Sequence, residues 1–152
     1  MKRLLLLHNN TLFREGLALL LEWQTGLGSV QAGSIAEADR ILAEPHHDEV
    51  CLAIVGIDMP NEDDIELIKE LRELETDCPV LALTTTRSLH RHIRALQAGA
   101  EEVITIGESI RELTGAVRRL AAGVPSREQG LGHLAPTPFA RSVDPRVCKV
   151  PS

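Results

Sequence analysis

The first 123 residues alternate short apolar runs with longer amphipathic stretches. Each apolar run has the length of a strand, and each following stretch carries apolar residues at the three- and four-residue spacing of a helix with one buried face. Five such strand-then-helix repeats follow one another, a pattern typical of a parallel sheet with helices on both faces. The sequence therefore predicts an α/β fold with strands near 3–7, 29–32, 50–55, 80–83 and 103–106.

End signals define the helices between these strands. Two S-x-x-E segments, beginning at Ser34 and Ser109, have the spacing in which each side chain bonds the other residue's free backbone amide at a helix start. Gly99 and Gly123 suit the left-handed exit of a helix. We expect helices over 11–24, 35–43, 88–98 and 110–123, and one that carries Ile65, Ile68, Leu71 and Leu74.

Apolar spacing also assigns faces to these helices. In the first helix, the residues that recur at helical spacing are Phe13, Leu17, Leu20 and Leu21. The helix over 88–98 places three apolar residues on one face: Leu89, Ile93 and Leu96. The last helix is expected to bury a stripe of four: Ile110, Leu113, Val117 and Leu120.

The character of the chain changes after Gly123. Residues 124–152 hold five of the eight prolines and few bulky apolar side chains, so they offer little burial to offset the entropy of ordering. We therefore divide the chain into one compact domain, residues 1–123, and a flexible proline-rich tail, residues 124–152.

Charge and cysteine content exclude several classes of function. The net charge is −6 with histidines neutral, and no run of Lys or Arg forms a nucleic-acid footprint, so we expect no direct nucleic-acid partner. No stretch is apolar for long enough to span a bilayer, so we expect no membrane partner. Three widely spaced cysteines without a CxxC pair favour a reducing cytoplasm over a zinc or disulfide site.

Four segments match the successive signatures of one protein family: Leu12-Phe13-Arg14-Glu15-Gly16-Leu17, Asp58-Met59-Pro60, Leu83-Thr84 and Leu96-Gln97-Ala98-Gly99-Ala100. Through them the chain resembles a CheY-like response-regulator receiver domain over about residues 1–123. The first and last segments are most similar to the LuxR/NarL-type branch, whose members usually carry a helix-turn-helix. The resemblance implies a flavodoxin-like, doubly wound sheet with strand order 2-1-3-4-5 and helices on both faces.

The resemblance also implies that the phosphorylation chemistry of receivers is missing. The aspartate that accepts the phosphoryl group matches Gly56, and the two acidic residues that hold Mg²⁺ match His8 and Asn9. The lysine that pairs with the phosphoaspartate matches Ile106, and only the switch hydroxyl, Thr84, is retained. We therefore expect a degenerate pseudo-receiver that is not an enzyme and has no metal or cofactor.

Two nearby side chains allow other interpretations. Asp58 keeps the strand parity of Gly56 and is a candidate substitute acceptor, although receivers commonly have a variable polar residue there. His8 is either a phosphohistidine or metal ligand, or a strand-end histidine that bonds nearby backbone, which is the role we expect. His90 and His92 lie two apart on a helix and are expected to be solvated rather than a metal pair.

These observations favour an interaction module. We expect it to act in signal transduction or transcriptional regulation by phosphorylation-independent contact with another protein or a second copy. The expected dimer faces are the fourth helix with the fifth strand and helix, or the first and fifth helices. Trp23 is either partner-facing or core cover. Five arginines are candidates for a partner-facing or simply solvated face: Arg91, Arg94, Arg111, Arg118 and Arg119.

Three alternatives remain at this stage. A small molecule could replace phosphorylation as the ligand that biases the domain. A flavin- or nucleotide-binding enzyme could use the same scaffold, although residues 8–12 contain no glycine for a phosphate cradle. The chain could also be a fragment of a longer DNA-binding regulator, since the branch it resembles usually continues into a helix-turn-helix.

Overall fold

A computed structural model describes residues 2–44, 49–57, 63–74, 78–85, 87–107 and 110–124, with the backbone alone at 63 and 64. The strands within these ranges are β1 (Arg3–Leu7), β2 (Gly28–Ala32), β3 (Val50–Ile57), β4 (Val80–Thr84) and β5 (Glu102–Thr105). The helices are α1 (Thr11–Thr25), α2 (Ile35–Ala43), α3 (Asp63–Arg72), α4 (Leu89–Ala98) and α5 (Ile110–Ala121). No helix in this part of the chain is long and apolar enough to cross a membrane.

The strands form one parallel sheet in the order β2-β1-β3-β4-β5. This confirms the flavodoxin-like, doubly wound topology expected from the sequence. Strand β3 lies at the centre and is almost wholly buried, as its unbroken apolar run predicts. The fold therefore brings the carboxyl ends of all five strands to one edge of the sheet, where open α/β sheets place their functional residues.

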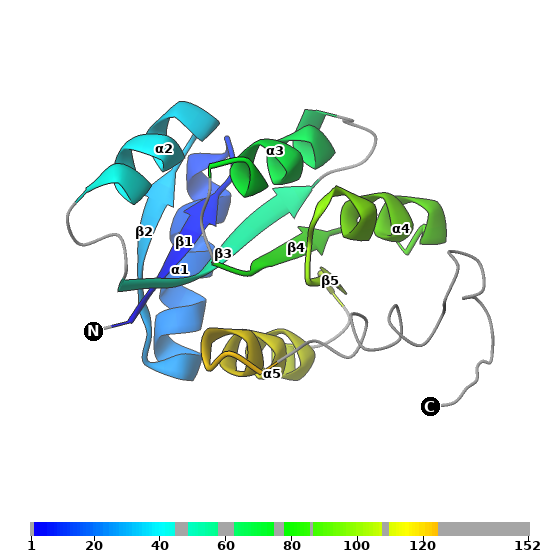
Figure 1. Ribbon diagram of the computed structural model, residues 1–152. Helices are drawn as coiled ribbons and strands as arrows, with labels where there is room; N and C mark the ends of the chain where they lie inside the picture. Colours follow the sequence, from blue (N-terminus) through cyan, green and yellow to red (C-terminus); the bar gives the residue numbers. More distant parts are fainter. Residues whose placement is uncertain are drawn as a thin grey trace.

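Helices cover both faces of the sheet (Figure 1), and beneath them each face carries its own apolar layer. Because side chains alternate along a strand, Leu5 and Leu7 of β1 belong to one layer while Leu4 and Leu6 belong to the other. Helices α2, α3 and α4 cover the first layer, and α1 and α5 cover the second. The candidate groups that follow lie where these two layers meet the carboxyl ends of the strands.

The predicted reciprocal pair at Ser34 forms in part. The Ser34 hydroxyl accepts a hydrogen bond from the Glu37 backbone N–H at 3.2 Å, as predicted, but the Glu37 carboxylate accepts from the Gly33 N–H in place of the Ser34 N–H. Helix α2 therefore begins and ends as predicted. Gly99 and Gly123 both adopt positive φ, at 124° and 86°, after α4 and α5. Ser109 lies outside the described residues.

Some strand and helix limits differ from the prediction. Strand β3 continues to Ile57, and α3 ends at Arg72, which leaves Leu74 outside the helix. Strand β5 begins one residue early, at Glu102, because the buried Glu102 carboxylate is paired with an arginine and can enter the sheet. It ends at Thr105, so Ile106 lies in the following turn.

Two expected helix faces are wrong in part. On α4, Leu89 and Ile93 are 71% and 43% exposed, and the buried residues are Arg91, Ala95 and Ala98. The small Ala95 and Ala98 allow this helix to approach the sheet closely, so Leu89 and Ile93 point away from the core. Leu96 is partly buried against it. On α5, Leu113, Val117 and Leu120 are buried as expected, but Ile110 in the first turn is 54% exposed.

Candidate functional site

The strand ends gather four of the predicted pocket positions at one edge of the sheet. His8 follows β1, Gly56 precedes the last residue of β3, Thr84 ends β4 and Ile106 follows β5. The Ile106 backbone N–H donates to the Thr84 carbonyl at 2.7 Å, which fixes the two strand ends together. His8 and Thr84 are buried, whereas Ile106 is 40% exposed.

The space beside Gly56 is filled by two rings. A Cβ placed on Gly56 would lie 2.6 Å from His8 Cδ2 and 3.1 Å from Phe13 Cε2. The two rings are themselves in contact, with centroids 4.7 Å apart and planes inclined by 48°. A side chain of any kind at position 56 therefore requires the His8 ring to move, and an aspartate is not accommodated in the present arrangement.

Backbone hydrogen bonds hold the His8 ring in this position. The ring Nδ1 accepts from the Asn10 backbone N–H at 3.0 Å, and the backbone N–H of His8 donates to the Ala32 carbonyl at 3.2 Å. Because Nδ1 accepts, that nitrogen carries no proton in this geometry. His8 is thus a strand-end residue bonded to nearby backbone, and it is only 6% exposed.

Arg14 ties the loop after β1 to α1 and β2. Its guanidinium donates to the His8 carbonyl, to Gln31 Oε1 at 3.2 Å and to Thr11 Oγ1 at 3.4 Å. It also lies against Gly33, where an added Cβ would come within 3.1 Å of Nη1. The corner that carries the metal-binding acids in receivers is therefore held by an internal cation.

The residues at this corner do not fit Mg²⁺. The positions offer an imidazole with Nδ1 already bonded, the exposed amide side chain of Asn9, and Gly56, which has no side chain. Mg²⁺ prefers carboxylate and water oxygens in an octahedral arrangement. Among the described residues no group of three or more His, Cys, Asp or Glu side chains could hold a metal ion. Asp58, the candidate substitute acceptor, lies outside the described residues.

The candidate arginines separate into different environments. Arg91 is only 4% exposed, so the expectation that it lies on an exposed face is wrong. Arg119 forms a two-pronged pair with Glu102, at 3.2 and 3.1 Å, that joins α5 to β5. The exposed Arg118 donates to the Gln24 carbonyl at the end of α1. Arg94 is half-buried and Arg111 is exposed.

The two histidines of α4 also differ from each other. His90 is exposed as expected, but His92 is half-buried, and its Nε2 lies 3.3 Å from the Thr105 hydroxyl of β5. His92 therefore joins α4 to the strand-end region instead of lying in solvent. The two cysteines that the structure describes, Cys51 and Cys78, are free thiols. Burial raises the pKa of Cys78 to about 12, which keeps it in the unreactive thiol form at neutral pH.

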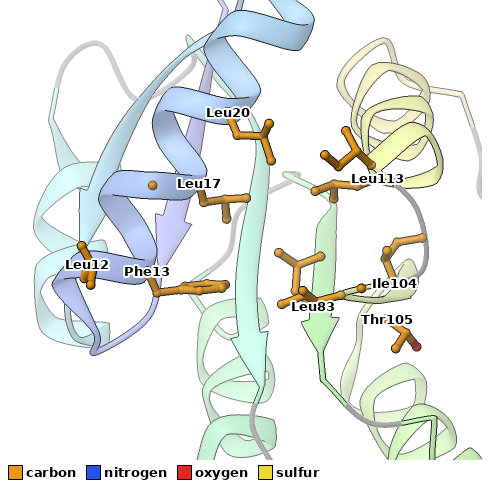
Figure 2. Close-up of a pocket in the computed structure, with 12 residues that line it drawn as sticks. Leu12, Phe13, Leu17, Leu20, Leu83, Ile104, Thr105 and Leu113 are labelled. Atoms are coloured by element: carbon orange, nitrogen blue, oxygen red, sulfur yellow. The ribbon is translucent and has the colours of Figure 1, made fainter.

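An apolar groove of about 490 Å³ runs between α1 and α5, next to the ends of β4 and β5 (Figure 2). Leu12, Phe13, Leu17 and Leu20 line it from α1. Leu17 and Leu20 point toward Leu113 of α5, and Leu83 and Ile104 lie between the two helices. Two of its lining residues, Leu12 and Ile110, are 80% and 54% exposed. Trp23 of α1 is 83% exposed, so the interpretation of Trp23 as core cover is wrong. The pattern that could have shown this surface is the large number of leucines in 11–24, more than one buried face needs.

Comparison with known proteins identifies the family. Residues 4–118 match the family described as the response regulator receiver domain. The chain is 30% identical to the transcriptional regulatory protein PhoP of Escherichia coli (strain K12), over 78% of this chain and 51% of that protein. It is 29% identical to PmrA of Pectobacterium parmentieri, over the same shares. The chain thus spans about half the length of the curated relatives it matches.

Solved structures agree on the fold. A receiver domain protein from Clostridium thermocellum has a TM-score of 0.67 at 21% identity and covers 80% of this chain and 95% of its own. A LuxR-family two-component response regulator from Aurantimonas sp. SI85-9A1 has a TM-score of 0.68 at 23% identity and covers 86% and 92%. Neither these structures nor PhoP and PmrA show the LuxR/NarL-type branch, which stays a prediction. The fold and the match over residues 4–118 show that the chain belongs to the response regulator receiver domain family, the signalling domain of two-component regulators.

Proposed function

We propose that this receiver domain acts in signal transduction without phosphorylation, through contact with another protein or with a second copy of itself. The observation that carries the proposal is the space at Gly56, where a Cβ would meet His8 Cδ2 at 2.6 Å. Phosphoryl transfer needs a carboxylate there, and the place it would need is filled by a buried, hydrogen-bonded ring.

The rest of the pocket supports the same conclusion. A metal would meet His8 and Asn9 in place of carboxylates, and a phosphoryl group would meet Ile106 in place of a positive charge. Thr84 keeps the expected hydroxyl but is buried at the end of β4. Since acceptor, metal ligands and cationic partner are replaced together, one shifted position in the alignment cannot restore the chemistry.

Without phosphorylation, any switching between two conformations needs another ligand that binds them unequally. We infer that a protein surface supplies this energy. PhoP and PmrA are named as transcriptional regulatory proteins, so an effect on transcription through a partner chain is part of the proposal. The proposed setting is cytoplasmic.

The test is exposure of the full chain to acetyl phosphate, and separately to beryllofluoride, each with Mg²⁺. We expect no phosphoryl adduct by intact mass and no change in the amide NMR spectrum, while a phosphorylatable receiver treated in parallel changes in both. A stoichiometric adduct, or shifts centred on the ends of β1, β3 and β4, would show that the domain still uses phosphate.

The groove favours one second candidate, a receiver that senses a small molecule. Its volume of about 490 Å³ lies within the usual range of ligand sites, and its lining is apolar except for the hydroxyl of Thr105. We expect an apolar fluorescent probe to bind, and Ile110→Arg at the rim to weaken that binding. Leu89→Arg on α4 is the control and should have no effect. The flavin- or nucleotide-binding enzyme gains no such support, because residues 8–12 form no glycine-rich cradle.

A further inference from the structure

A residue without a side chain helps to keep the groove between α1 and α5 open. Gly16 lines the groove from α1, and a Cβ added there would meet nothing within 4 Å. Because Phe13, Leu17 and Leu20 line the same wall, a larger residue at position 16 would extend into the groove. A glycine inside a helix lowers its stability relative to alanine, so this room comes at a cost to α1.

The walls of the groove are mainly aliphatic. Leu17 and Leu20 point toward Leu113 of α5, and two further aliphatic residues, from β4 and β5, lie between the helices (Figure 2). Phe13 is the one aromatic residue among the described residues that line the groove. Its ring already packs on that of His8, with centroids 4.7 Å apart. The surface open to a ligand is thus mostly that of leucine and isoleucine side chains, which suits an aliphatic ligand better than a flat aromatic one.

The described lining of the groove offers nothing that pairs with a charge. None of the described residues that line it is acidic or basic. The only polar side chain among them is that of Thr105, and its hydroxyl lies 3.3 Å from His92 Nε2 on α4. A charged group held in the groove would therefore lose hydration without gaining a partner. The lining favours an uncharged ligand.

The groove is long and lies open at its rim. Its lining on α1 extends from Leu12 to Leu20. Eight steps along a helix rise about 12 Å, roughly the length of an extended chain of about ten carbons. On α5 the lining consists of Ile110 and Leu113. A slender molecule can therefore lie along α1 with its length against apolar side chains.

We propose that the groove binds the aliphatic chain of an uncharged small molecule, and that Gly16 provides the room for it. The inference rests on the proposed function, because it names the class of ligand that would take the place of phosphorylation. The source is a free molecule instead of a membrane lipid, since the net charge is −6 and the sequence contains no run of Lys or Arg to hold it on an anionic surface.

The first test uses 1-alkanols of about six to about fourteen carbons, titrated into the full chain and followed by methyl NMR of Leu17, Ile104 and Leu113. We expect each added methylene to tighten binding by about two- to fourfold. The gain should stop at on the order of ten carbons, when the chain fills the groove. Decanoate and decylammonium should bind at least about threefold more weakly than decanol.

The second test fills the groove from within. Gly16→Leu should weaken decanol binding by at least about tenfold, because the new side chain occupies the place of the ligand. The matched control is Gly115→Leu, the same change on α5 at a position where an added Cβ also meets nothing within 4 Å. Gly115 is not among the lining residues, so this variant should bind decanol as the parent chain does. Circular dichroism should show both variants folded.

Several results would overturn the inference. They are no binding of any alkanol, equal loss in Gly16→Leu and Gly115→Leu, tighter binding of decanoate or decylammonium than of decanol, and cosedimentation with phosphatidylcholine vesicles. A dimer that Gly16→Leu makes monomeric would show that a second copy fills the groove. Residues after 124 that become protease-sensitive only in Gly16→Leu would show that the chain's own tail fills it. An adduct with acetyl phosphate would instead refute the proposed function, whatever the alkanols do.

Discussion

At Gly56 the rings of His8 and Phe13 occupy the space that a side chain would need. The family resemblance located Gly56 and His8 as two separate departures from the receiver pattern. The structure shows that they are one packing arrangement, since the ring after β1 fills the gap left at the end of β3. Sequence could not reveal this coupling, because the two residues are distant along the chain and meet only once the sheet has formed.

Any side chain at position 56 should therefore destabilise the fold. We expect Gly56→Ala to lower the free energy of unfolding by roughly 1–3 kcal/mol through overpacking against His8. Gly16→Ala is the matched control, because an added Cβ at this helical position meets nothing within 4 Å and should stabilise by up to about 1 kcal/mol. Urea unfolding measures both. Equal stability of Gly56→Ala and the parent chain would mean that the ring moves aside freely.

Restoring the acceptor should not restore the chemistry. We expect Gly56→Asp to remain unmodified by acetyl phosphate with Mg²⁺, because the new carboxylate would lack both acidic neighbours and a lysine partner. Adding His8→Ala should recover part of the stability that Gly56→Asp loses, since it removes the blocking ring. Intact mass and urea unfolding follow the two effects, and efficient labelling of Gly56→Asp would show that His8, Asn9 or Ile106 was wrongly matched.

At the scale of elements, hydrophobic spacing predicted which segments form strands and helices better than which way each helix faces. Helix α2 was predicted residue for residue because a serine cap defines its start. The buried face of helix α4 was predicted from Leu89 and Ile93, but Ala95 and Ala98 are the residues that pack on the sheet. The size of the apolar side chains does not by itself show which side of a helix is buried, because small side chains let the helix pack closely on the sheet.

The pair between β5 and α5 was also hidden from the sequence, which assigned no role to Glu102 and placed Arg119 on a partner-facing or solvated face. The Glu102 side chain is 7% exposed and that of Arg119 is 32% exposed. We expect Arg119→Ala to cost about 1–3 kcal/mol, because it leaves a buried carboxylate without its charged donor. The control is Arg40→Ala, whose pair with Glu37 is 4.0 Å long and exposed, and which should cost less than about 0.5 kcal/mol. Thermal and urea unfolding would refute the prediction if the two variants lost equal stability.

At the scale of the whole molecule, the fold was predictable because its signals repeat five times along the chain and agree with one another. The surfaces that could bind a ligand or a partner could not be predicted in this way. The groove is lined by residues of α1, β4, β5 and α5, which are distant along the chain and meet only in the folded domain. The positions matched to the phosphorylation site could thus be named from the sequence, whereas the groove is found only in three dimensions.

The division of the chain into a domain and a tail remains to be measured. The last helix ends at Ala121. The Ala121 carbonyl accepts a hydrogen bond at 3.4 Å from the ammonium of Lys2, which precedes the first strand. We expect limited proteolysis to cut after about Gly123 and to leave a folded core, because the strand–helix repeats end there and the remaining sequence lacks a buried stripe.

The competing view is that Leu131, Leu134 and Phe139 dock on the sheet edge or in the vacant phosphorylation pocket as a built-in ligand. The space beside Gly56, which matches that pocket, is an unsuitable site for them, since His8 and Phe13 fill it. The sheet edge and the groove between α1 and α5 are the sites that remain for docking. Truncation after Gly123 should therefore leave both the urea midpoint and the Trp23 emission unchanged. Protease resistance through Lys149, or a truncated chain that is less stable and emits at longer wavelength, would show instead that the tail is held on the domain.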